Sequence, residues 1–214
     1  MSHFYAMLSR MKNINRWGLM RNTRNENLSE HSLEVAFIAH ALAVIGNKRL
    51  GKSINADKVA VAAMFHDTSE IITGDMPTPI KYYNSEIKDA YKKIEAIAES
   101  QLTAMLPEDL RDEFTGYFSP DKETVALIKA ADKISALIKC IEEIKMGNME
   151  FKEAEKSTRA SIDALNLEEV KIFKEEFLGI NRGDPLVKFH RKEKVSAKLL
   201  DKPLFFVLAR KDRS

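Results

Sequence analysis

Cysteine is almost absent from this chain, and its scarcity limits the class of protein to which the chain can belong. Cys140 is the only cysteine among 214 residues, so no disulfide can form within the chain, as is usual in a reducing cytoplasm. The N-terminal segment lacks the apolar stretch of a signal peptide. No uninterrupted apolar run approaches the roughly 18 residues that cross a bilayer. We therefore expect a cytoplasmic protein without a membrane span.

A strong net charge is also lacking. The 34 lysines and arginines against 32 acidic residues leave a net charge of +2, which is too small to favour nucleic acid as a partner. Residues 182–214, however, carry ten basic and four acidic side chains. This basic segment could touch an acidic partner or RNA, or it could be a solvated terminus. We predict one domain over residues 1–180 and a basic C-terminal tail of unknown role over 181–214.

Proline and glycine are sparse, at six and eight residues, and apolar residues recur at helical spacing almost throughout. We therefore predict an all-α fold with additional C-terminal helices and an extended tail. The expected helices cover about residues 4–11, 29–46, 55–72, 85–105, 121–146, 149–164 and 167–178, with a short segment after Pro107. The only strand-like pattern is KPLFFVLAR near the end, and Gly183 and Pro185 mark the expected boundary of the tail.

Local signals predict where some of these helices begin and end. Ser29 is expected to be the N-cap of the second helix, and Gly46 its C-terminal stop. Asn55 or Asp57 is expected to cap the third helix. The segment TGDMPTP, residues 73–79, is expected to be a turn.

Four polar residues lie at or near apolar helical stretches: His31, His66, Asp67 and Asp132. Burial of one uncompensated polar group costs roughly 2–7 kcal/mol, so these four need partners. Two imidazoles and two carboxylates suit a divalent transition metal, and a six-coordinate ion would keep two positions open for water and substrate. The alternative is a set of buried His–Asp hydrogen bonds, or side chains that face water. If a metal binds, the histidine positions favour a single ion.

Two further residues are placed by helical spacing. Glu70 lies four residues after His66 and shares its helix face, so it can face the open side of the metal and move protons, or it can be a surface carboxylate. His40 lies nine residues after His31, half a turn around the same helix, and is expected to be a core or surface residue and not a ligand.

The loop over residues 15–26 contains Arg16, Arg21 and Arg24, with Trp17 beside the first. The planar donor fork of arginine suits phosphate, and the indole could pack against a sugar or a base. From composition alone, a packing tryptophan with solvated arginines is the favoured explanation of the loop. Asp75 could accept hydrogen bonds from a sugar hydroxyl or could form its own Asx-turn.

The spacing H…HD…D, with Glu70 after the HD pair, resembles the HD-domain phosphohydrolases. Three segments resemble the YfbR-like bacterial 5′-deoxynucleotidases more closely: INRWGLMRNTRNENLSEHSLEVA, AMFHDTSEIITGDMPTPIKYYN and LIKAADKISALIKCIEEI. The resemblance covers about residues 3–175, and the tail does not align. It implies an HD-domain helical bundle, a cytoplasmic homodimer, and hydrolysis of deoxyribonucleoside 5′-monophosphates to deoxyribonucleosides and phosphate.

The same resemblance implies roles for individual residues. His31, His66, Asp67 and Asp132 would hold one divalent metal, typically cobalt, manganese or a similar ion. Glu70 would transfer a proton, and Arg16 would hold the 5′-phosphate and act in catalysis. Trp17 would occupy the place of a ribose 2′-hydroxyl. The substrate would also contact His31, Asp67 and Asp132 through the metal site, and Asp75, Met76, Pro77 and Thr78 on the nucleoside side.

Two other functions stay open at this point. Another HD hydrolase could act on a nucleoside triphosphate, a cyclic nucleotide or an alarmone, but such enzymes need further phosphate-binding cations or a second metal. A catalytically silent, nucleotide-binding helical module would be expected to lack a ligand or the glutamate, and all five positions are filled here.

Overall fold

The computed structural model describes residues 2–81 and 83–178, and these are helical without a regular strand. The helices are α1 (Phe4–Leu8), η1 (Ser9–Asn13), α2 (Leu28–Arg49), α3 (Ala56–Phe65), α4 (Glu70–Thr73), α5 (Thr78–Lys81), α6 (Ser85–Ala104), α7 (Glu108–Phe118), α8 (Lys122–Lys145), η2 (Met149–Phe151), α9 (Lys152–Asp163) and α10 (Glu168–Glu176). The all-α prediction is therefore confirmed for the described part of the chain.

The chain divides into two units, Met1–Phe173 and Lys174–Ser214, and the predicted site lies wholly in the first. The predicted boundary at residue 180 and the strand-like KPLFFVLAR fall outside the described residues. They stay predictions.

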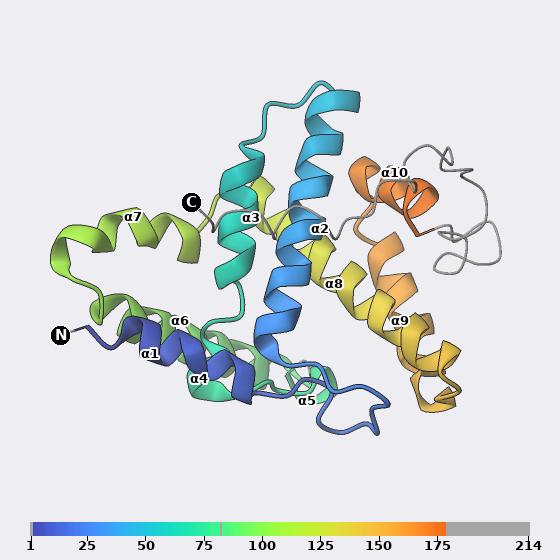
Figure 1. The fold of residues 1–214 in the computed structure, drawn as a ribbon, viewed down its shortest axis with the longest axis horizontal. Helices are drawn as coiled ribbons and strands as arrows, with labels where there is room; N and C mark the ends of the chain where they lie inside the picture. The colour runs from blue at the N-terminus through green and yellow to red at the C-terminus, as the bar shows by residue number, and fades with distance from the viewer. Residues whose placement is uncertain (1, 82, 179–214) are drawn as a thin grey trace, which may run out of the picture. The chain divides into compact units, whose positions relative to one another are not determined.

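The centre of the first unit is formed by α2, α3 and α8, which pack against one another (Figure 1). By length and composition alone α2 could cross a membrane, a property it shares with the core helices of many soluble proteins. In this fold Val35, Leu42 and other apolar residues of α2 are buried in the core. Leu137 of α8 and Ala62 of α3 are fully buried as well. This layer brings the start of α2 and the end of α3 close to the middle of α8.

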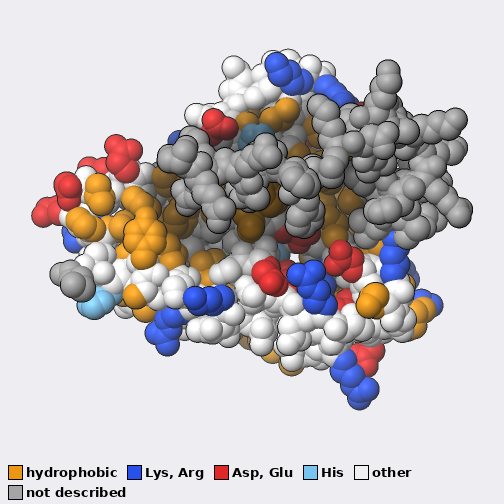
Figure 2. Space-filling model, viewed as in Figure 1, with side chains coloured by type: hydrophobic (Ala, Val, Ile, Leu, Met, Phe, Trp, Pro, Cys, Tyr) orange, Lys and Arg blue, Asp and Glu red, His pale blue; other side chains and the backbone are white. Residues whose placement is uncertain are grey.

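A second apolar cluster lies where α1, α6 and α7 meet. Its buried members are Phe4, Leu102 and Leu106. Phe4 makes edge-to-face contacts with Phe114 and Phe118 at ring-centroid distances of 5.5 and 6.5 Å. Figure 2 shows hydrophobic side chains gathered over α7. This region is held by aromatic packing.

The loop between η1 and α2 is fixed by Glu143 of α8. The Glu143 carboxylate accepts hydrogen bonds from the backbone N–H and hydroxyl of Thr23, both at 2.9 Å, and from Asn148. It also pairs with Lys139. Burial would raise the pKa of Glu143, but these hydrogen bonds, that from Lys139 foremost, lower it to about 2. The loop is thus anchored to α8 by a buried, ionised carboxylate.

Four of the expected boundaries need correction. Asn27, and not Ser29, caps α2, because its side chain accepts from the Glu30 backbone N–H. Gly46 lies inside α2, which continues to Arg49; a Cβ at Gly46 would lie 3.1 Å from Glu169 Oε1, so the glycine allows close approach instead of ending the helix.

The third helix is also shorter than predicted. It begins after the Asn55 cap, as expected, but ends at Phe65, and a tight turn separates it from the four-residue α4. Gly74, at φ +73°, then ends α4 with a backbone conformation that favours glycine. The predicted turn 73–79 contains the start of an additional short helix, α5.

Candidate metal centre

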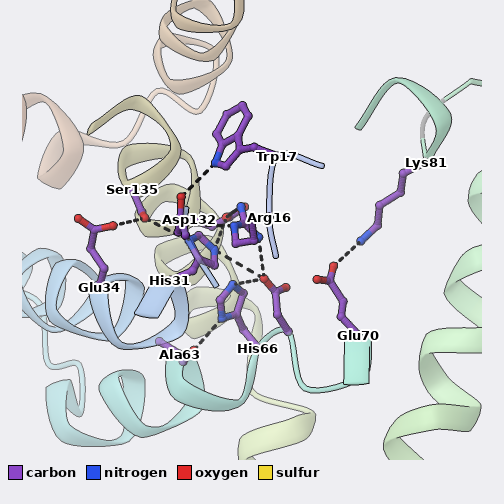
Figure 3. A network of polar contacts seen from close by, with 12 residues as sticks. Arg16, Trp17, His31, Glu34, Ala63, His66, Glu70, Lys81, Asp132 and Ser135 are labelled. Carbon is purple, nitrogen blue, oxygen red and sulfur yellow. Dashed lines mark hydrogen bonds and ion pairs between the residues drawn. The ribbon is translucent and has the colours of Figure 1, made fainter. Parts of the chain in front are cut away.

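Three of the predicted ligands meet at the end of α3 and the start of α2. His31 is in the first turns of α2, His66 follows the last residue of α3, and Asp67 begins the next turn. One ligand atom from each lies within 4.8 Å of the other two. Figure 3 shows the His31 and His66 side chains pointing toward the same region. The tight turn after α3, which the periodicity did not predict, is what brings His66 and Asp67 to α2.

The His66 ring is oriented for a cation. Its Nδ1 lies 2.7 Å from the carbonyl oxygen of Ala63, which can only accept, so Nδ1 carries the proton. Nε2 is then an acceptor, buried and without a hydrogen-bond partner, at 3.1 Å from Asp67 Oδ2. Two acceptors this close, one of them buried, are stabilised by a shared cation.

The His31 ring is fixed in the same way. Its Nδ1 faces Glu26 Oε1 at 3.1 Å and the Ser135 hydroxyl at 3.2 Å, and that hydroxyl donates to Glu34. Burial alone would lower the pKa of His31, but hydrogen bonds with Asp132 and Glu26 raise it to about 9. These carboxylates stabilise positive charge, and a divalent cation satisfies the same requirement.

Asp132 joins the site from α8. Its Oδ1 lies 3.1 Å from His31 Nε2, although it is outside the set of three atoms that converge within 4.8 Å. The side chain is 41% exposed. Burial in the site would raise the Asp132 pKa, but the hydrogen bond with His31 lowers it, so the carboxylate stays ionised. The four residues therefore fit a divalent metal, with Asp132 on the open side.

Arg16 lies beside this set of ligands. Its guanidinium contacts Asp67 Oδ2 at 3.4 Å, Asp132 Oδ1 at 3.9 Å and Glu26 Oε1 at 3.3 Å. Burial would lower the Arg16 pKa, but the three carboxylates raise it, so the side chain is a permanent cation. By contrast Arg21 is 92% exposed and pairs with Glu150. Of these two, only Arg16 contacts predicted ligands.

Trp17 follows Arg16 with a positive φ of 59°, a conformation that is strained for a bulky residue. Its Nε1 donates to Glu26 Oε2 at 3.0 Å. The indole packs against Phe151 with ring centroids 5.3 Å apart. These contacts hold the Trp17 side chain in a fixed position next to Arg16.

Glu70 is the first residue of α4 and is buried, with 4% of its surface exposed. Burial, together with the negative charges of Asp67 and Asp75, raises its pKa to about 9. Lys81 lies 4.0 Å from Glu70 Oε1, whereas Oε2 has no hydrogen-bond partner. Figure 3 shows this pair beside the ligands. A buried carboxyl with a raised pKa can hold a proton at neutral pH.

The nucleoside-side residues are only partly connected to the centre. Burial raises the pKa of Asp75, whereas the positive charge of Arg16 and the nearby Trp17 backbone lower it, so this loop lies close to both residues. Met76 and Pro77 are half-buried and lead into α5, where Thr78 is exposed. His40 lies elsewhere, 3.8 Å from Asp57, so the prediction that it is not a ligand agrees with its position.

Sequence reasoning missed four residues that support the site. Ser135 and Glu34 lie three residues after Asp132 and His31, so helical spacing contained a signal for them. Lys81 is in the short helix that was not predicted. Glu26 lies in a loop, where no periodicity marks it.

The chain matches a known family along most of its length. Residues 3–180 match the family described as 5′-deoxynucleotidase YfbR-like. A 5′-deoxynucleotidase of Vibrio cholerae is 51% identical over 179 residues, which covers 82% of this chain and 92% of that protein.

Solved structures agree with the fold. An HD-domain phosphohydrolase from Listeria innocua has a TM-score of 0.72 at 24% identity and covers 83% of this chain and 87% of its own. A cyanophage S-2L HD phosphohydrolase, bound to dA and one catalytic Zn²⁺, has a TM-score of 0.55 at 21% identity over 78% of this chain and 89% of its own. This chain therefore belongs to the YfbR-like 5′-deoxynucleotidase family, with the all-α fold of the HD-domain phosphohydrolases.

Proposed function

We propose that this protein hydrolyses deoxyribonucleoside 5′-monophosphates to deoxyribonucleosides and phosphate, with one divalent metal held by His31, His66, Asp67 and Asp132. The observation that carries the proposal is the buried His66 Nε2 without a partner, aimed at Asp67 beside Arg16. A cationic arginine next to a metal site is the arrangement that phosphate binding requires.

The metal is proposed to be Co²⁺, Mn²⁺ or a similar transition ion, since two imidazoles and two carboxylates suit such ions. When bound, it would supply Lewis acidity and a water of lowered pKa. The second nitrogens of both rings are already held, His66 by Ala63 and His31 by Glu26 and Ser135. These contacts orient Nε2 of each ring as a ligand.

Arg16 is proposed to bind the 5′-phosphate. Its guanidinium lies between Asp67 and Asp132 at the open side of the site. There it can exchange contacts with carboxylates for contacts with phosphate oxygens, and it stabilises negative charge that builds up as the phosphorus is attacked.

Glu70 is proposed to deliver the proton that the leaving group needs. Hydrolysis adds water to phosphorus and breaks the P–O5′ bond, so the departing oxygen must gain a proton. Glu70 is buried, and the charges of Asp67 and Asp75 favour its protonated form.

Trp17 is proposed to select the sugar, and Asp75, Met76, Pro77 and Thr78 to line the nucleoside side. A rigid indole can reject a 2′-hydroxyl because it cannot repack to admit the added oxygen. The position of Asp75 next to the Trp17 backbone supports a shared sugar pocket.

We also propose a cytoplasmic homodimer without a nucleic-acid partner. An exposed apolar face on α2 supports dimerisation: Leu33, Phe37 and Val44 are 48%, 67% and 37% exposed. Such a face favours burial against another protein surface. Light scattering after size exclusion tests this proposal, because Phe37→Glu should yield monomers if the face is the interface, and an unchanged dimer would assign the contact to another surface.

The function is tested by phosphate release from paired nucleotides, dAMP against AMP and dTMP against UMP, with EDTA and with added Co²⁺, Mn²⁺ or Zn²⁺. Metal-dependent release that favours each deoxy partner supports the reaction, the cofactor and the sugar preference together. Metal-dependent release without that preference removes the role of Trp17. Release from neither pair with any metal contradicts the proposed substrates.

A further inference from the structure

Both the backbone and the side chain of Trp17 are held in place by specific contacts. Its backbone is in the left-handed region at φ 59°, and its carbonyl oxygen accepts hydrogen bonds from the Met20 backbone N–H at 2.9 Å and from the Asn22 side chain at 3.3 Å. A strained conformation persists only when its surroundings determine it. The backbone therefore fixes where the indole begins.

Two side chains then fix the indole itself. Glu26 accepts a hydrogen bond from Nε1 at 3.0 Å, at the polar edge of the ring. Phe151 packs against the ring with centroids 5.3 Å apart and is itself fully buried. One contact is polar and directional and the other is apolar, so together they restrict both tilt and translation of the ring.

These two residues are attached to different parts of the site. Glu26 also contacts Arg16 Nε at 3.3 Å and His31 Nδ1 at 3.1 Å, so it links the indole to the phosphate and metal residues. Phe151 ends η2, where Asn148 donates to the Arg21 carbonyl at 2.7 Å and so attaches η2 to the same loop. Phe151 touches the indole, and its ring is also near the Lys139 ammonium, at 5.8 Å.

From these contacts we infer that Glu26 and Phe151 are specificity-determining positioning residues, which hold the Trp17 indole still and so exclude a 2′-hydroxyl. The inference rests on the proposed function. A movable indole would admit the extra oxygen at small cost, so the sugar preference depends on rigidity as well as on the presence of tryptophan.

The single tryptophan allows the position of the indole to be measured without substrate. Because Trp17 is the only tryptophan, all indole emission comes from this site. Phe151→Leu should give a higher acrylamide-quenching constant, a red-shifted emission maximum and lower anisotropy than wild type. In the same variant the ratio of kcat/KM for dAMP to that for AMP should fall by at least about fivefold, mainly through faster AMP hydrolysis.

Glu26 is tested by two substitutions. Glu26→Ala removes the carboxylate that accepts the hydrogen bond from Trp17 Nε1. The indole should therefore become more mobile, and the ratio of kcat/KM for dAMP to that for AMP should fall. The KM for dAMP should also rise, because Arg16 loses the ion pair with Glu26. Glu26→Gln keeps an acceptor for Nε1 but no charge. It should therefore restore the emission spectrum and the sugar ratio while KM stays raised, a separation that a merely structural role would not produce.

Phe4→Leu is the matched control, because Phe4 is equally buried but packs against Phe114 and Phe118. It should lower the melting temperature without changing tryptophan emission or the sugar ratio. If Phe151→Leu and Glu26→Ala leave both readouts at wild-type values, the inference is wrong while the proposed function stands. A wild-type enzyme that hydrolyses neither nucleotide instead overturns the proposed function. One that hydrolyses both equally removes the sugar role of Trp17, and this inference with it.

Discussion

The metal centre and the aromatic cluster around Phe4 lie in the same helical unit but are held together by different forces. Phe4, Phe114 and Phe118 pack as rings, without a charge among them. At the metal centre, contacts of His31, Asp67 and Arg16 are charged, and buried polar atoms lack hydrogen-bond partners. A region that contributes only to stability can be packed with apolar side chains alone. A binding site, by contrast, must keep some polar atoms without hydrogen-bond partners in the protein, so that they can bind the ligand.

The largest expected effect is at the metal centre. Asp67→Ala removes a carboxylate that faces both histidines, at 3.1 Å from His66 and 3.6 Å from His31. We expect metal affinity to fall by more than about 100-fold, and activity with it. Metal content after dialysis and phosphate release measure both. Asp57→Ala, a change to a 97% exposed aspartate, is the control, and stoichiometric metal in Asp67→Ala would contradict the ligand assignment.

Glu70→Gln should separate metal binding from turnover. Metal content should match that of wild type, because Glu70 is not among the proposed ligands, but turnover should fall by about 10²–10⁴-fold if the proposed proton transfer is lost. Glu86→Gln, at an exposed position on α6, should change neither quantity. A near-wild-type rate for Glu70→Gln would remove this residue from the mechanism.

The aromatic cluster should respond in the opposite way. Phe4→Ala opens a cavity at a fully buried position and should lower the free energy of unfolding by about 3–5 kcal/mol. Metal affinity, measured well below the melting temperature, should stay at the wild-type value. Tyr83→Ala, at an aromatic residue that is 78% exposed, should have little effect on the free energy of unfolding. Lost metal binding in folded Phe4→Ala would show that the two regions are coupled.

A smaller effect, dependent on pH, is expected at Glu143. Its folded-state pKa of about 2 lies below the usual glutamate value, so its ionised form contributes stability above pH about 4.5, and that contribution is lost as the pH falls through 2. The shift corresponds to at most roughly 3 kcal/mol. Urea unfolding of wild type and of Glu143→Gln should be measured from pH 7 to pH 2. The difference between their free energies of unfolding should shrink below pH 4.5.

The control for this titration is the neighbouring, exposed Glu142. Glu142→Gln should change the free energy of unfolding only slightly at every pH. A Glu143→Gln difference that does not depend on pH would mean that the loop anchor works through hydrogen bonds alone. Either outcome shows how strongly the loop that carries Arg16 and Trp17 depends on a single buried charge.

Helical spacing predicted much of this molecule because helices are local structures. The long helices α6 and α8 begin and end within a residue or two of their predicted limits. The errors fall where tertiary contacts override local signals. Gly46 looked like a stop but lies inside α2, where a Cβ would be in tight contact with Glu169, and the end of α3 depends on a turn with no periodic pattern.

The sequence alone predicted the all-α class, which the structure confirms, and it proposed His31, His66, Asp67, Asp132 and Glu70 as site residues from residue types, helical spacing and the family resemblance. Only the tertiary structure decided that Glu26 joins Arg16, Trp17 and His31, and that Phe151 backs the indole. These contacts join a loop to residues up to 134 positions away in the chain. Neither periodicity nor capping signals extend over such a separation, because both act within a few residues.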